Sequence, residues 1–311
     1  MYEATAFFSN LLLLLKRITV MRKNLRVLAL LALLATVLFS CNNDTPAADA
    51  PVAKDTTAAA SLRLGVQLWT FHEFDFVTAI AKADSAGIKF IEAFPGQKLG
   101  GDFKDSSFDI GMSAEGREKV KALLASKGIT MVAFGVVGPQ TTEDWDKTFA
   151  LAKDMGIQYI SAEPLPKHWN YIDSLAGVTG IKIAIHDHPK PSHYWHPDSV
   201  LAAVQGHPNI GSCADIGHWG RNGLDPVDCL KKLEGHVFGV HFKDITEFNK
   251  VDAGDKIVGT GVLNVPAVLA ELKRQQFKGI LSIEREDNWF NNVPDVKQTK
   301  TYFEAETAKL K

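Results

Sequence analysis

The stretch IKIAIHDHP, from Ile181 to Pro189, starts as a run of strand-forming aliphatic residues and ends abruptly in two histidines and an aspartate. Three later stretches have the same design, an apolar run followed by a polar end: SCADIGH at 212–218, VHFKD at 240–244 and LSIERE at 281–286. Each of them places a His, Asp or Glu where a buried strand should leave the core. Strands that end this way and alternate with helices are typical of a barrel with a polar site at its C-terminal mouth.

Strand and helix patterns alternate from Ser61 to the end of the chain. Eight apolar segments are expected as strands: 64–71, 88–94, 129–136, 157–163, 181–186, 210–215, 237–242 and 280–284. The helices expected after them are 75–86, 114–127, 142–155, 168–175, 198–204, 226–233, 265–275 and 294–310. Eight such units in about 250 residues predict a single-domain α/β fold of the (β/α)8 TIM-barrel type.

Two further observations bear on this prediction. A doubly wound sheet is disfavoured, because the first strand is followed by the turn WTFHEFD and not by a Gly-rich phosphate loop. The segment 96–112 is a long polar insert without a strand pattern, and long loops in compact domains are usually functional or disordered.

The composition is that of a globular protein with a large core. The 311 residues are 46% hydrophobic and 23% charged, and 9% are aromatic, which is too many for a disordered chain. The net charge of −2 gives no electrostatic reason to bind nucleic acid. We therefore expect no nucleic-acid partner.

Residues 1–41 have the pattern of an export signal. A basic start at 21–26 precedes the uncharged apolar run 27–39, which at about 13 residues is shorter than the about 20 of a spanning helix. The run leads into LFSC at 38–41, which resembles the lipobox of bacterial lipoproteins. This resemblance implies cleavage before Cys41 and lipidation of its thiol. The alternative is a short membrane anchor with an incidental cysteine.

Met21 begins a complete signal by itself, so we expect translation to start there and not at Met1. Residues 42–61 are rich in Ala, Asp, Thr and Pro, and we expect a flexible tether. Residues 62–311 then form the barrel. The predicted location is the bacterial envelope, on its periplasmic or outer-membrane face, with a lipid anchor as the membrane contact.

Polar side chains collect at the carboxyl ends of the expected strands, which a closed barrel brings together. They are Glu92, Glu163, His186, His188, Asp215, His218, His241, Lys243, Glu284 and Glu286. Carboxylates and imidazoles that converge in one mouth repel or lose hydration unless a cation lies among them. Mixed nitrogen and oxygen ligands suit Mn²⁺, Zn²⁺, Co²⁺ or Fe²⁺, whereas a set of oxygens suits Mg²⁺. The residues therefore predict a divalent metal, and we favour Mn²⁺.

The domain from about Leu62 onward resembles the xylose-isomerase-like TIM-barrel superfamily, in the branch called sugar phosphate isomerase/epimerase. The motifs that carry the resemblance are GVQLWT, IHDHP, ADIGHW, VHFKD, GTG and SIE, in this order. The resemblance implies a metal held from strands five to eight, and Asp215, His241 and Glu284 match three of its ligand positions. His186 stands where ketose 3-epimerases and inosose isomerases have Glu. Glu163, His186 or both therefore complete the metal site.

The other polar residues of the mouth are assigned to proton transfer and substrate. Glu163 or Glu284 could remove a proton next to a carbonyl, His186 or His188 could shuttle it, and Lys243 could donate to a substrate oxyanion. The residues expected to contact a sugar are Trp69, His188, Tyr194, His218 and Trp219.

Less specific roles remain open for several of these residues. Lys243 could be a surface lysine, and Glu163 could fix a loop or cap a helix. Glu92 is expected to be structural. The loop that carries Tyr194 either covers the mouth or packs as a rigid turn between prolines.

Together these features predict a metal-dependent sugar isomerase or epimerase. Expulsion of a β-substituent by the same residues would instead make it a 3-keto-glycoside lyase. Because phosphorylated sugars are mostly cytoplasmic, an exported protein is expected to act on an unphosphorylated sugar or glycoside. A DNA-repair enzyme like endonuclease IV would need a basic groove, which the net charge argues against. A non-catalytic sugar-binding lipoprotein is the third hypothesis.

Overall fold

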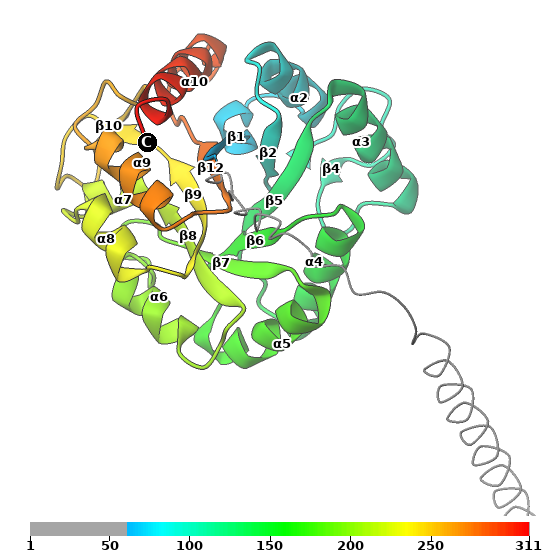
Figure 1. Ribbon diagram of the computed structural model, residues 1–311. Coiled ribbons are helices and arrows are strands. Elements are labelled where there is room, and N and C mark those ends of the chain that lie inside the picture. The colour runs from blue at the N-terminus through cyan, green and yellow to red at the C-terminus, as the bar shows by residue number, and fades with distance from the viewer. Residues whose placement is uncertain (1–60, 311) are drawn as a thin grey trace, which may run out of the picture. The chain divides into compact units, whose positions relative to one another are not determined.

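A computed structural model of the protein describes residues 61–310. Eight parallel strands close into a barrel in the order β1-β12-β9-β8-β7-β6-β5-β2, which confirms the expected TIM barrel (Figure 1). The strands are β1 (Arg63–Gln67), β2 (Phe90–Ala93), β5 (Thr130–Val137), β6 (Tyr159–Ala162), β7 (Lys182–His186), β8 (Ile210–Asp215), β9 (Val237–Phe242) and β12 (Ile280–Ile283). The predicted signal, the lipid site at Cys41 and most of the tether lie outside the described residues, so they stay predictions.

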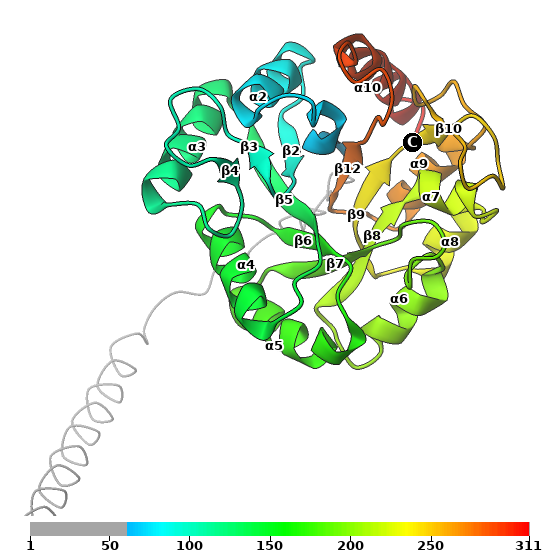
Figure 2. The same ribbon diagram turned by 180° about the vertical axis from the view of Figure 1, so that it is seen from behind.

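Helices surround the barrel, as both faces of the molecule show (Figures 1 and 2). They are α2 (Phe76–Ser85), α3 (Ala114–Lys127), α4 (Thr142–Asp154), α5 (Trp169–Thr179), α6 (Pro197–Val204), α8 (Pro226–Lys232), α9 (Val265–Arg274) and α10 (Val293–Thr307). Local sequence signals fix several ends. Asp75 caps α2 by accepting a hydrogen bond from the Thr78 amide at 2.8 Å, and Gly128 ends α3 in the left-handed conformation. The last helix, α10, packs against α2 and α9 and so completes the ring.

The chain departs from the expected pattern just after the first strand. This strand was expected to run to Phe71, but β1 ends at Gln67 and a 3-10 helix, η1 (Leu68–Phe71), follows. The Gln67 side chain accepts a hydrogen bond from the Trp69 amide at 3.1 Å and turns the backbone out of the sheet. Trp69 is thereby placed at the rim of the barrel mouth.

Several short elements were not expected from the sequence. The insert 96–112 contains a hairpin of β3 (Gln97–Lys98) and β4 (Ser107–Phe108), and a second hairpin joins β10 (Asp244–Ile245) to β11 (Asp255–Lys256). Helix α7 (Ile216–Arg221) starts directly after β8, and η2 (Pro166–His168) precedes α5. Strands of two residues and a helix of six are too short to give a hydrophobic period.

The barrel strands are buried on both faces, which explains their nearly continuous apolar runs. Polar side chains replace apolar ones at the carboxyl ends of β7, β8, β9 and β12. Within residues 61–310, no helix combines the length and apolarity that a membrane span needs.

Candidate functional site

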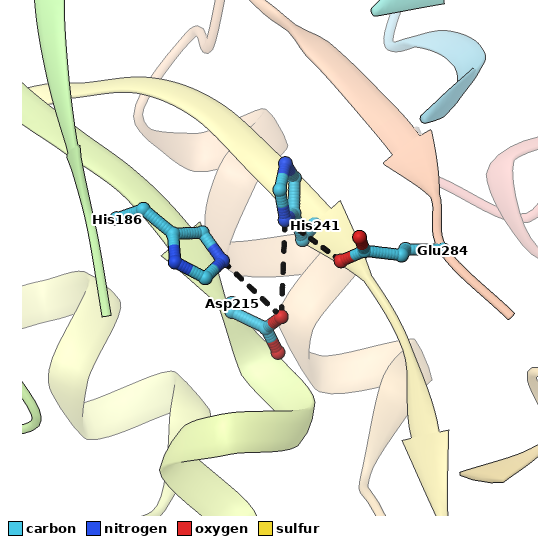
Figure 3. Close-up of side chains that lie close together, drawn as sticks. All are labelled: His186, Asp215, His241 and Glu284. Atoms are coloured by element: carbon cyan, nitrogen blue, oxygen red, sulfur yellow. Dashed lines mark ion pairs between the residues drawn. The ribbon is translucent and has the colours of Figure 1, made fainter. Parts of the chain in front are cut away.

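Four neighbouring strands bring four buried polar side chains together at the mouth (Figure 3). His186 ends β7, Asp215 ends β8, His241 belongs to β9 and Glu284 follows β12. The register explains the meeting, because Asp215 pairs with His241, and His241 pairs with Ser282, two residues before Glu284. Each of the four offers one ligand atom, and all four atoms lie within 4.8 Å of one another.

The atoms of this four-residue group are close but incompletely paired. Glu284 Oε2 lies 2.9 Å from His241 Nδ1, and Asp215 Oδ2 lies 3.8 Å from the same nitrogen and 3.6 Å from His186 Nε2 (Figure 3). In the described part of the chain, Asp215 Oδ2 and both ring nitrogens of His186 lack a hydrogen-bond partner. Buried polar atoms without partners, in a mixed nitrogen and oxygen set, fit a divalent cation.

Lys243 lies beside this group and is completely buried, so the surface-lysine alternative was wrong. Its Nζ is 3.1 Å from Asp215 Oδ2, 3.0 Å from Glu284 Oε2 and 3.0 Å from Glu286 Oε1. Burial by itself would lower the pKa of Lys243, but the three carboxylates outweigh burial and raise this pKa well above its usual value. Lys243 is therefore an ammonium ion that shares two oxygens with the candidate metal group.

Glu163 lies behind His188 and outside the four-residue group. Its Oε1 contacts His188 Nδ1 and accepts from the His188 amide at 3.2 Å, while Oε2 accepts from Ser192 Oγ at 3.1 Å. Burial would raise the pKa of Glu163, but the nearby imidazoles of His186 and His188 lower it, so the group is ionised. Glu163 thus orients His188 and leaves Nε2 as the ring nitrogen available to a ligand.

Glu92 lies beneath His241, inside the barrel, and is completely buried. Its Oε1 is 3.2 Å from His241 Nε2 and accepts from Ser161, and its Oε2 accepts from Ser282 at 2.9 Å. Burial by itself would lower the pKa of His241, but its neighbours Cys213, Glu284 and Glu92 outweigh burial and raise this pKa well above its usual value. If a cation displaced the proton from Nδ1, the carboxylate of Glu92 would hold the remaining proton on Nε2. His241 then offers Nδ1 to the four-residue group. Glu92 was expected to be structural, and it also orients His241, a residue of the candidate site.

His218 extends the site on the α7 side. Its Nδ1 is 2.8 Å from Arg221 Nη1 and its Nε2 is 3.4 Å from Asp215 Oδ2. Burial, together with the nearby positive charge of Lys243, lowers the pKa of His218 well below its usual value, so the ring is neutral.

A cavity of about 410 Å³, called here the mouth cavity, opens onto these groups. It is lined by Gln67, Trp69, Phe94, Pro95, Gly135, Val136, His186, His188, His218, Glu284 and Glu286. Trp69, His188 and His218 were expected to contact substrate, and all three lie in this lining. Gln67 and Glu286 were not assigned a role from the sequence. Their signals were position, since Gln67 ends the first strand and Glu286 shares the face of Glu284.

Two residues expected to contact substrate lie elsewhere. Trp219 and Tyr194 are buried in the core, and neither lines the mouth cavity. The Tyr194 hydroxyl donates to the Pro164 carbonyl and accepts from the Trp169 indole at 3.0 Å, and burial raises the pKa of Tyr194 to about 12. The loop of Tyr194 therefore packs as a rigid turn, and the expected sugar contact of both residues is corrected.

The barrel is similar in sequence to one known protein family and in structure to several solved proteins. The family described as xylose isomerase-like TIM barrel matches residues 80–305. A solved but uncharacterised protein from Parabacteroides distasonis ATCC 8503 is 35% identical, with a TM-score of 0.66 and coverage of 79% of this chain and 99% of that one.

Two more distant structures share the fold. A D-tagatose 3-epimerase-like protein is 16% identical with a TM-score of 0.64, covering 79% of this chain and 97% of its own. A probable 3-DHS dehydratase from Bacillus anthracis is 16% identical with a TM-score of 0.61, covering 78% and 98%. No curated protein matches the chain.

Proposed function

The chain belongs to the xylose isomerase-like TIM barrel family, and from this membership we propose that it is a divalent-metal-dependent sugar isomerase or epimerase. The reaction would begin with abstraction of a proton next to a carbonyl, on an unphosphorylated keto-sugar or glycoside. The observation that supports this most is the buried group of two imidazoles and two carboxylates at the edge of the mouth cavity.

The proposed ligands are His186, Asp215, His241 and Glu284. Glu163 is left out, because both of its oxygens already serve His188 and Ser192. When bound, the ion would polarise the carbonyl of the sugar and so acidify the neighbouring C–H. Two nitrogens and two oxygens suit Mn²⁺, Zn²⁺ or Co²⁺ better than Mg²⁺, and Mn²⁺ remains our choice.

We assign proton transfer to His188, with Glu163 as the carboxylate that orients it. The sequence offered Glu163 or Glu284 as the base. Glu163 does not line the mouth cavity and Glu284 is a proposed metal ligand, whereas His188 lines the cavity and is free for proton transfer. Glu286, three residues after β12, is a second group of the lining that could take up a proton and then return it at another position of the substrate. Lys243 does not line this cavity and its ammonium contacts three carboxylates, so we assign it to balancing the charge of the metal group and not to the substrate oxyanion expected from the sequence.

The lining of the mouth cavity supports a substrate without phosphate. It includes Glu284 and Glu286, but none of its described residues is Lys or Arg. A phosphate group needs cationic or backbone N–H donors, which this lining offers poorly. Expulsion of a β-substituent by the same residues would give a 3-keto-glycoside lyase. A second hollow beside the cavity, described below, favours this alternative.

Proton exchange tests the proposal directly. The full chain, with Mn²⁺ added, is incubated with unphosphorylated keto-sugars in deuterated water and followed by NMR. We expect deuterium at the carbon next to the carbonyl, and about a hundredfold or greater loss of this exchange in His188→Ala, a typical loss for a general base. Asp215→Ala should lose both bound metal and exchange. The proposal would be contradicted if none of the tested keto-sugars exchanged a proton, or if Asp215→Ala kept its full metal content.

We also propose export and lipid anchoring through Cys41, on the strength of the basic start, the short apolar run and the lipobox-like LFSC. Expression from Met21 with radioactive palmitate should label the wild-type chain and not Cys41→Ser. Equal palmitate labelling of the wild type and Cys41→Ser would contradict this part of the proposal.

A further inference from the structure

A second hollow of about 320 Å³ lies beside the mouth cavity, and we call it the outer hollow. Its lining includes Trp69 and Phe94, which also line the mouth cavity. The rest of its wall comes from the segments 72–75 and 96–98, which follow η1 and β2. The two hollows are therefore neighbours, and Trp69 and Phe94 form the wall that they share.

Trp69 is a fixed aromatic surface in this wall. Its ring stacks on His72 with centroids 4.5 Å apart and an interplanar angle of 14°, and it meets Phe94 edge-on at 5.0 Å. His72 is held in turn by the Trp69 carbonyl, 3.0 Å from its Nδ1, and by the ring of Trp289. Trp69 nevertheless stays 40% exposed. A rigid, exposed indole suits the apolar face of a sugar ring, because little conformational entropy is lost when the ring stacks on it.

Gln97 provides an unfilled polar partner in the wall of the outer hollow. Its side chain is only 3% exposed, and its Nε2 donates to the Phe74 carbonyl at 3.2 Å. Its Oε1 has no hydrogen-bond partner among the residues of the described barrel. A buried amide oxygen left this way is unfavourable unless a donor reaches it, and a ligand hydroxyl is such a donor.

The charges of the outer hollow disfavour an anionic ligand. Its lining contains two carboxylates, Glu73 and Asp75, and one lysine, Lys98. Carboxylates repel phosphate but accept hydrogen bonds from hydroxyl groups. An indole, an amide and two carboxylates form a combination that recognises a neutral, hydroxyl-rich ring.

We propose that the outer hollow is a second sugar subsite, so that the substrate is a neutral glycoside of two rings. One ring would occupy the mouth cavity, and the other would lie in the outer hollow against Trp69, with a hydroxyl donating to Gln97 Oε1. This inference rests on the proposed sugar chemistry of the mouth cavity and adds the size of the substrate. Each hollow alone is at the lower end of the range for small-molecule sites, which agrees with one ring in each.

Calorimetric titration of the full chain tests this inference, with glucose compared with the disaccharides cellobiose, maltose and trehalose. At least one disaccharide should bind about tenfold more tightly than glucose, since a second ring adds several hydrogen bonds. Glu73→Ala and Gln97→Leu should each reduce this ratio to about threefold or less, because each removes a hydrogen-bond partner. Glu143→Ala, which removes an exposed carboxylate on α4, is the control and should keep the full ratio.

Two results would overturn the subsite. In the first, no disaccharide of the panel binds more tightly than glucose. In the second, Glu73→Ala keeps the wild-type ratio of disaccharide affinity to glucose affinity. Glu73 is 40% exposed, so its replacement should fold even if Gln97→Leu does not. The proton-exchange assay separates the two proposals. A chain that prefers disaccharides but exchanges no proton would disprove the proposed function and keep the subsite.

Discussion

The buried carboxylate of Glu92 favours Nδ1 of His241 as the ring nitrogen that is available to a metal. The Glu92 side chain bonds to two serines and lies 3.2 Å from the Nε2 of His241. It therefore holds both the ring orientation and the proton position of a proposed metal ligand. Glu92 lies below the mouth and does not line the mouth cavity, so its effect on the site is indirect.

We expect Glu92→Gln to weaken metal binding by about 10–100-fold, the usual effect of losing a carboxylate behind a histidine ligand. Glutamine keeps the shape and can still bond to Ser161 and Ser282, but it no longer stabilises the protonated Nε2 of His241. A competition titration with a fluorescent chelator measures the affinity, and circular dichroism confirms the fold. Glu115→Gln, on the surface of α3, serves as the control. Unchanged affinity in Glu92→Gln would show that His241 needs no such support.

At the residue scale, the sequence predicts chemistry well only where strand periodicity fixes direction. His186, Asp215, His241 and Glu284 stand at strand ends on the inward face, and the register brings all four together as expected. Trp219 and Tyr194 follow strands in helix α7 and in a loop, where alternation says nothing about direction. Both side chains instead pack into the core, and no local sequence pattern predicts this direction.

At the element scale, the long helices and strands were predictable and the connections were not. The expected strand 237–242 coincides with β9, and the expected helix 114–127 coincides with α3. By contrast η1 and α7 each begin at a side chain that accepts a hydrogen bond from a local backbone amide, and the hairpin strands are only two residues long. Asp215 is an example, because it caps α7 by accepting from the His218 amide at 2.8 Å while it also belongs to the metal group.

A hydrogen bond between two elements on the outside of the barrel makes stability depend on pH. The Trp145 indole, in α4, donates to His168 Nδ1 in η2 at 3.1 Å. The indole is only a donor, so the neutral imidazole is required. Burial and the neighbouring Lys167 lower the pKa of His168 below its usual value near 6.5. His168 therefore binds a proton less readily in the folded state than in the unfolded chain. Its contribution to the free energy of unfolding should be fully present above about pH 6.5 and should decrease as the pH falls below this value.

We therefore expect the melting temperature to fall between pH 7.5 and pH 5.0, and to fall less in His168→Gln. Glutamine can accept from the Trp145 indole through its carbonyl and has no proton to gain in this range. His193→Gln, in the exposed part of the loop before α6, should behave like the wild type. If the wild type and His168→Gln lose the same number of degrees, the hydrogen bond does not set the pH dependence.

On the scale of the whole molecule, closure of the barrel is what converts scattered residues into a site. Strand β1 pairs with β12 on one side and with β2 on the other, so strand ends more than 200 residues apart in the chain surround one mouth. The eight repeated units predict this closure from sequence. The depth of Lys243, and the position of Glu163 behind His188, depend on side-chain packing inside the closed ring and could not be predicted.

The same closure predicts how a metal should affect the whole fold. An ion that binds four buried groups of the native barrel, and not the unfolded chain, stabilises by about 2.7 kcal/mol at 100 times its dissociation constant. For a domain of about 250 residues this corresponds to a rise in melting temperature of about 5–10 °C. Mn²⁺ should give this rise at pH 7.5, and excess EDTA should reverse it. Mg²⁺ should give less, because it prefers oxygen to imidazole ligands.

Asp215→Asn separates binding at this site from binding elsewhere on the molecule. The substitution keeps the size of the side chain but removes the charge that faces His186, His241 and Lys243. In this variant the shift by Mn²⁺ should largely disappear, whereas Asp228→Asn, on the exposed side of α8, should retain it. An equal shift in Asp215→Asn and the wild type would mean that the ion binds outside the mouth. The buried carboxylates would then take their counter-charge from Lys243 and from protonated His186 and His241, whose pKa values are raised, and the proposed chemistry would lose its electrophile.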